Sequence, residues 1–223
     1  DPETMMGYSS FLYKIGLFDE AEAKIGKFYE MAMLDDIHHK RYVDCIDKRY
    51  EYLGSKVQSF FRNVTGLNYF YNLLLSEQPK EHSFFQSYVT QDESRKALHI
   101  GQKAFNTEDK VEDYLKSDIC QSVKSWLVTL MENYKTLLYS GQLDIRVATS
   151  LTDNMINSLK WKGSDIYSQT KRKIWKVDGK VAGYLKKFKS FYYMVIRDAG
   201  HIVPYDQPKV ALELITQFIN GHL

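Results

Sequence analysis

The sequence predicts an α/β protein in which helices come first and strands later. Polar segments rich in helix-forming residues fill the chain up to about residue 125. Short apolar runs and an Asp-Gly turn signal then alternate with helical patterns up to residue 223. The strands are too few for a stable open sheet, because each would keep apolar faces and unpaired edges. We therefore expect a sheet that is incomplete on its own.

Length and composition suit one or two compact domains. The 223 residues are 44% hydrophobic and 26% charged, as in ordinary globular proteins. With 30 basic and 28 acidic residues the net charge is only +2, so no overall field indicates a nucleic-acid partner. No apolar run approaches the roughly 18 residues of a membrane span. The start at Asp1-Pro2, without Met or a signal-peptide pattern, resembles an excised piece.

Helical signals dominate the first part. A long helical stretch is predicted from residue 18 to about 53, with Gly54 as its stop. A short helix is expected over 95–101, another starting at 106–109 and a further one near Ser117. A three-and-four spacing then predicts a buried helix face made of Val123, Trp126, Leu127, Leu130 and Met131.

Strand signals appear in the second part. Residues 136–139 and 191–196 read as buried strands, and 147–159 as a helix between them. Residues 174–177 and 180–184 predict a hairpin, because Asp178-Gly179 supplies the positive φ angles of a two-residue turn. A last helix starts at Pro208 and stops near Gly221, with an apolar stripe of Val210, Ala211, Leu214, Ile215, Phe218 and Ile219.

Two loops place an ionisable residue directly after a predicted strand. Asp144 follows the first buried strand and His201 the last. In open α/β sheets, catalytic groups gather at the carboxyl ends of strands, and Asp before His is the α/β-hydrolase order. On this pattern alone, Asp144 as a helix cap and His201 as an ordinary turn histidine are at least as well supported.

Several runs resemble the serine carboxypeptidase family. Residues 199–208 (Ala-Gly-His-Ile-Val-Pro-Tyr-Asp-Gln-Pro) closely match that family's Gly-His-Met-Val-Pro-x-Asp-x-Pro signature around its catalytic histidine. Residues 123–126 and 139–144 are most similar to the vitellogenic-like carboxypeptidases. Residues 1–2 and 13–17 look like the segment after the family's Asn-Gly-x-x-Asp-Pro stretch. The likeness covers nearly the whole chain in order.

The resemblance implies the C-terminal portion of an α/β-hydrolase fold with a helical cap insertion. Residues 1–125 would be the mainly helical cap, and 126–223 the C-terminal half of the core. Asp144 would be the triad acid and His201 the general base. No Gly-x-Ser-x-Gly elbow occurs, and Ser9 is a poor nucleophile because its surroundings lack the closing glycine and a preceding strand. The serine is therefore expected on an N-terminal part that this chain needs as its partner.

The function implied is removal of C-terminal residues from peptides through an acyl-enzyme, without metal or other cofactor. Two alternatives stay open: an acyltransferase of the same family, and a non-catalytic binding or storage protein derived from it. The family also implies the secretory pathway, either secreted or lysosomal (vacuolar). A homodimer is left open.

Three smaller features concern individual residues. Ile202 replaces the family's usual Met, which would alter the substrate pocket on the leaving-group side. Asn63 opens a glycosylation sequon that has force only in the secretory pathway. Cys45 and Cys120 permit one disulfide or two thiols, and the family's other cysteines are mostly missing.

The remaining charged and histidine clusters indicate no further site. His38 and His39 are adjacent, and His82 and His99 lack partners at metal-ligand spacing, so all four are expected to be solvated. The basic residues around the hairpin are interpreted as a solvated face.

Overall fold

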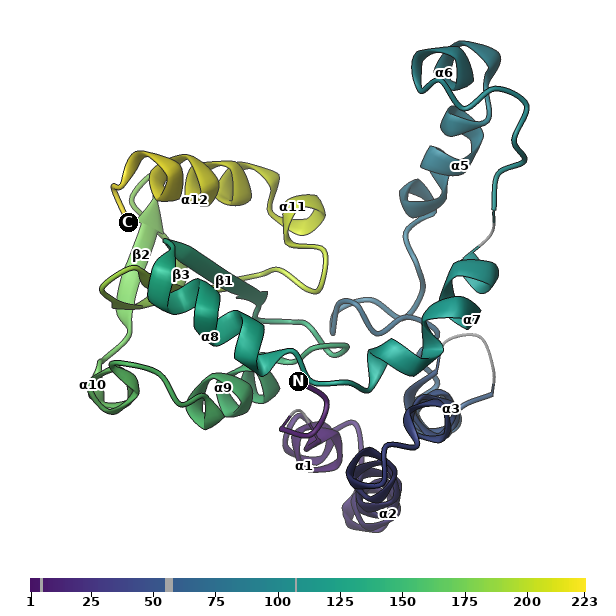
Figure 1. Cartoon of the computed structure of the whole chain (residues 1–223), viewed down its shortest axis with the longest axis horizontal. Helices are drawn as coiled ribbons and strands as arrows, with labels where there is room; N and C mark the ends of the chain where they lie inside the picture. Colours follow the sequence, from purple (N-terminus) through teal and green to yellow (C-terminus); the bar gives the residue numbers. More distant parts are fainter. Residues whose placement is uncertain (5, 55–57, 107) are drawn as a thin grey trace.

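The computed structural model describes residues 1–4, 6–54, 58–106 and 108–223. Figure 1 shows a helical part followed by a sheet with helices on both sides. The helical part comprises α1 (Tyr8–Lys14), α2 (Glu20–His38), α3 (Tyr42–Leu53), α4 (Phe60–Thr65), the 3₁₀ turn η1 (Lys80–Ser83), α5 (Phe84–Val89), α6 (Asp92–Ala97) and α7 (Glu108–Ile119). The second part comprises α8 (Lys124–Asn133), β1 (Thr136–Gly141), α9 (Thr149–Ser158), α10 (Ser164–Gln169), β2 (Lys173–Val177), β3 (Lys180–Phe188), β4 (Phe191–Ile196), α11 (Val203–Asp206) and α12 (Pro208–Asn220).

The helical stretch predicted over 18–53 ends at Leu53 as expected, but it is divided into two helices, α2 and α3. Lys40 adopts a left-handed φ of 58°. Its N–H donates to the carbonyl of Ile37, and the next N–H, of Arg41, donates to that of Asp36. This is a Schellman ending, which usually carries glycine, so a lysine there conceals it from sequence analysis. The α2 start carries a capping box, in which Asp19 and Glu22 accept each other's backbone N–H.

The helical part has its own core. Tyr8, Phe18 and Tyr52 are buried among α1, α2 and α3, and α3 also packs against α7. A disulfide joins Cys45 in α3 to Cys120, directly after α7. Figure 1 shows α5 and α6 extending away from the rest of the molecule. The helix expected to start near Ser117 begins at Lys124 instead, since Ser117 lies inside α7; of the predicted start over 106–109, Thr107 lies outside the described residues.

The predicted strands and hairpin are confirmed and form one sheet in the order β1-β4-β3-β2. β1 pairs parallel to β4, whereas β3 pairs antiparallel to both β4 and β2. The turn between β2 and β3 has φ of 50° at Asp178 and 76° at Gly179, as its sequence predicts. Successive residues of β4 alternate between two cores, one below α12 and one shared with α8, α9 and α10. β4 is therefore buried on both faces.

Three predicted apolar surfaces are more exposed than the sequence suggests. β1 is an edge strand in this chain, and Tyr139 is 44% exposed. In α8, Met131 is buried, but Trp126 is 72% exposed and Leu130 is also exposed. In α12, Ala211 and Leu214 are buried while Ile215 and Ile219 are exposed. Periodicity identifies an apolar face but not whether this chain supplies the element that covers it.

Candidate active site

The sheet brings the loops of Asp144 and His201 to the same edge. β1 and β4 are neighbouring parallel strands, with Gly141 opposite Ile196 at their carboxyl ends. The two loops that follow are joined by backbone hydrogen bonds: Gln142 N–H donates to Ile196, and Leu143 N–H to Ala199. Adjacent parallel strands therefore place the two predicted side chains side by side.

Asp144 and His201 form a direct hydrogen bond. His201 Nδ1 lies 2.9 Å from Asp144 Oδ2. The Asp144 side chain is only 5% exposed, whereas that of His201 is 33% exposed. Because a carboxylate only accepts, Nδ1 carries the proton, which leaves Nε2 as the nitrogen for proton transfer. Within the described residues, Nε2 has no hydrogen-bond partner.

Asp144 also forms a local hydrogen bond with the backbone, although not as the cap of a helix. Its second oxygen, Oδ1, accepts the backbone N–H of Val147 at 2.9 Å. That bond fixes the turn before α9, which begins at Thr149. The helix-cap interpretation of Asp144 is therefore wrong, because the N-cap of α9 is Ala148 and no side chain caps it. Each oxygen of Asp144 instead accepts one hydrogen bond, from Val147 or from His201.

A segment of the helical part holds both loops. In residues 71–73, which we call the strap, the carbonyl of Tyr71 accepts the backbone N–H of His201 at 2.6 Å. The N–H of Leu73 donates to the carbonyl of Leu143 at 2.8 Å. The Tyr71 ring lies 4.9 Å from the imidazole of His201, centroid to centroid. Sequence analysis missed the strap, because its partners lie far along the chain and leave no periodic signal.

A carboxylate in the histidine signature anchors the strap. Asp206 Oδ2 accepts the backbone N–H of Gly200 at 2.6 Å and Nδ2 of Asn72 at 3.0 Å. Asn72 is buried, and its Oδ1 accepts the N–H of Leu74. A Cβ on Gly200 would collide with the carbonyl of Tyr71, so this glycine permits the close approach. The spacing of Asp206 from His201 in the signature was the one available sequence signal.

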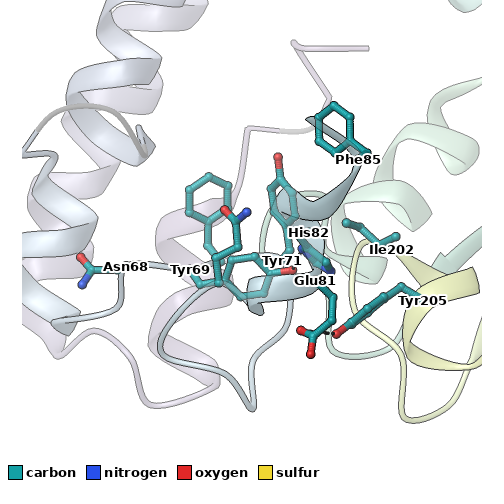
Figure 2. A pocket seen from close by; sticks show the side chains of 10 residues that line it. Asn68, Tyr69, Tyr71, Glu81, His82, Phe85, Ile202 and Tyr205 are labelled. Carbon is teal, nitrogen blue, oxygen red and sulfur yellow. Dashed lines mark hydrogen bonds between the residues drawn. The ribbon is translucent and has the colours of Figure 1, made fainter. Parts of the chain in front are cut away.

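A cavity of about 410 Å³ adjoins the histidine loop (Figure 2). Ile202, the predicted pocket residue, and Tyr71 both line it, and both are next to His201. The other lining residues are Asn68, Tyr69, Phe70, Gln78, Glu81, His82, Phe85 and Tyr205.

His82 is not the solvated histidine that the sequence suggested. It is half-buried, with Nδ1 3.3 Å from the Tyr69 hydroxyl and its ring 4.4 Å from that of Tyr205. Burial, followed by the negative charge of Asp206, raises the pKa of Tyr69 to about 12. The Tyr69 phenol therefore stays neutral at physiological pH.

The other candidate residues lie away from this pair. Asn63 is exposed in α4, where its Oδ1 accepts Nε2 of Gln58 at 2.6 Å. Ser9 is buried in α1, and its N–H donates to Glu30. Within the described ranges, no cluster of His, Cys, Asp or Glu is arranged to hold a metal ion. None of the described helices combines the length and hydrophobicity needed to cross a bilayer.

Comparison with known sequences identifies a family and several relatives. Residues 11–221 match the family described as Serine carboxypeptidase. The chain is 39% identical to the "Probable serine carboxypeptidase CPVL" of Homo sapiens, covering 99% of this chain and 48% of that protein. It is 37% identical to the "Venom serine carboxypeptidase" of Apis mellifera, again over 99% of this chain and 48% of the relative. It is 33% identical to the "Vitellogenic carboxypeptidase" of Aedes aegypti, with 98% and 48% covered.

A solved structure shares the fold. The prohormone-processing carboxypeptidase KEX1(delta)P of Saccharomyces cerevisiae matches with a TM-score of 0.67 at 19% identity, over 99% of this chain and 52% of that one. The chain thus spans about half the length of the relatives that it matches.

Proposed function

Because the chain belongs to the serine carboxypeptidase family, we propose that it supplies the acid and the base of a Ser-His-Asp triad. The observation that carries the proposal is the hydrogen bond between buried Asp144 and His201 at the carboxyl ends of neighbouring strands. The serine would lie on the part of the family's length that this chain does not span. The exposed edge of β1 and the apolar face of α8 are surfaces that such a part could cover.

The proposed reaction is peptide hydrolysis at a C-terminal residue. His201 Nε2 takes the proton of the serine hydroxyl while its oxygen attacks the last peptide carbonyl. The same imidazolium gives that proton to the leaving amine as the carbon–nitrogen bond breaks. Water, activated by His201, then hydrolyses the acyl-enzyme. Asp144 holds the Nδ1–H tautomer and stabilises the imidazolium throughout.

The helical part would act as a cap over this site. The strap, which belongs to the proposed cap (1–125), supports this because it forms hydrogen bonds with two loops of the proposed core (126–223). The cavity beside Ile202 would receive the side chain of the departing residue, because His201 must reach the leaving amine. Replacement of the family's Met by Ile202 would then shape this pocket.

A location in the secretory pathway fits the structure. The Cys45–Cys120 disulfide persists in oxidising compartments, and one relative is described as a venom protein. In that pathway the exposed Asn63 would be a glycosylation acceptor.

The test uses the full-length gene product that contains this chain. We expect it to react with a fluorophosphonate probe and to release free C-terminal amino acids from peptides, detected by mass spectrometry. His201→Ala should abolish both, while His222→Ala, which alters an exposed histidine near the C-terminus, should not. Labelling at an unchanged rate in His201→Ala would refute the assigned role. Transfer of acyl groups without peptide cleavage would indicate the acyltransferase. Absence of labelling would indicate the non-catalytic protein.

A further inference from the structure

The cavity beside His201 contains one anionic side chain. Of the 10 residues that line it, Glu81 alone carries a carboxylate, and Lys and Arg are absent from that set. Glu81 lies in η1, and its carboxylate is beside Tyr205 of α11, the short helix that begins after Ile202 (Figure 2). A wall with one negative charge and no positive charge attracts a cation.

The Glu81 carboxylate is bound by a neutral group. Tyr205 donates its hydroxyl to Glu81 Oε2 at 3.4 Å. Partial burial, and then the negative charge of Glu81, raises the pKa of the Tyr205 phenol, so the donor stays uncharged. In the part of the chain that the structure describes, Glu81 forms no ion pair with a basic side chain. Glu81 is exposed, so its carboxylate can pair with a cation that enters the cavity.

The rest of the wall suits a long side chain that ends in a cation. The rings of Tyr69 and Tyr205 can pack against methylene groups and attract a positive charge over their faces. The Tyr71 ring already has the guanidinium of Arg146 over it, at 5.2 Å from the ring centroid. His82 belongs to this wall, because Nε2 is buried and its ring packs edge-on against Tyr205. A cavity of about 410 Å³ has room for a lysine or arginine side chain.

We propose that this cavity selects substrates ending in lysine or arginine, with Glu81 pairing with the ammonium or guanidinium group of the departing residue. The inference rests on the proposed function, which places the leaving amine at His201 and thus its side chain in the adjoining cavity. It adds the substrate class, which comes from Glu81 and the tyrosines.

The experiment compares peptides that differ only in the last residue: lysine, norleucine or glutamate. Norleucine keeps the methylene stem of lysine without its charge. The full-length gene product should release lysine with a kcat/KM about ten-fold above that for norleucine, and glutamate slowest of all. Free arginine should also slow fluorophosphonate labelling more than free norleucine does.

Variants at exposed glutamates identify the residue responsible. Glu81→Gln should lower kcat/KM for the lysine peptide about ten-fold more than for the norleucine peptide, and Glu81→Lys should favour the glutamate peptide. The matched control Glu93→Gln, in the first turn of α6, should keep the natural preference.

The outcomes distinguish failure of the proposed substrate preference from failure of the proposed function. Equal rates for lysine and norleucine, or a lysine preference that survives Glu81→Gln, would overturn the inference while norleucine release upholds the peptidase. Absence of both labelling and release would overturn the proposed function, and the inference with it.

Discussion

Asp144 uses its two carboxylate oxygens for two different hydrogen bonds. One oxygen fixes the turn before α9 through Val147, and the other orients His201. An amide at this position keeps the acceptor oxygen for Val147 but offers an N–H to Nδ1, which favours the wrong imidazole tautomer.

Asp144→Asn should therefore preserve folding and lose turnover. By the triad template we expect kcat to fall on the order of 10⁴-fold. Peptide release by the full-length gene product and thermal unfolding measure the two effects. Asp153→Asn, on the surface of α9, serves as the control. Turnover within about ten-fold of the natural protein would contradict the role of Asp144 as the triad acid.

Asn72 joins the strap to the histidine loop, although it lies far from Asp144 and His201 in the sequence. Asn72→Ala removes the donor to Asp206 and the acceptor for Leu74. We expect a loss of about 1–3 kcal/mol in the free energy of unfolding, because buried polar partners remain. At temperatures well below the melting temperature, the rate of fluorophosphonate labelling should also decrease, since His201 loses a constraint. Asn133→Ala, on exposed α8, should change neither quantity, and an unchanged rate in Asn72→Ala would contradict the positioning role.

The junction of α2 and α3 shows how one element boundary depends on side chains from both helices. Asp36 is buried near the end of α2 and forms ion pairs with two residues beyond the turn. These are Arg41, the N-cap of α3, and Lys48 within α3. Burial opposes ionisation of Asp36, but the two cations outweigh it and lower its pKa. The left-handed Lys40 completes the turn between the helices.

This junction should make stability depend on acid. A carboxyl whose pKa is lower in the folded state stabilises the protein above its unfolded pKa of about 3.9, and this contribution is lost as pH falls through the folded pKa. Asp36→Asn should cost about 1–3 kcal/mol at pH 7 and flatten the decline below about pH 4. Urea unfolding at several pH values measures both. An unchanged acid slope would contradict the assignment, and exposed Asp113→Asn is the control.

One covalent bond links distant segments of the helical part. The Cys45–Cys120 disulfide spans 75 residues of sequence and lies buried in the helical core. Closing a loop of this length restricts the unfolded chain.

Replacing both cysteines with alanine should lower the free energy of unfolding by about 2–5 kcal/mol. Denaturant unfolding with and without a reducing agent tests this. Reduction should lower the free energy of unfolding of the natural protein towards that of the variant, whereas it should not change that of the variant. Equal stability of the two proteins under oxidising conditions would show that the disulfide is dispensable.

The chain also exposes surfaces that a self-sufficient sheet would cover. β4 is buried on both faces, but β1 is an open edge, and α8 presents Trp126 and Leu130 to solvent. The chain spans about half the length of the relatives that it matches.

Local signals in the sequence were sufficient for the strands, the Asp-Gly hairpin, the last helix and the two loops that carry Asp144 and His201. Each depends on a short period or a turn preference that neighbouring residues express on their own. The strap, the partners of Asp206, the left-handed Lys40 and the carboxylate of the cavity required the tertiary structure. Those features join residues far apart in the chain, or a backbone conformation that packing imposes on an unusual residue, and neither leaves a pattern along the sequence.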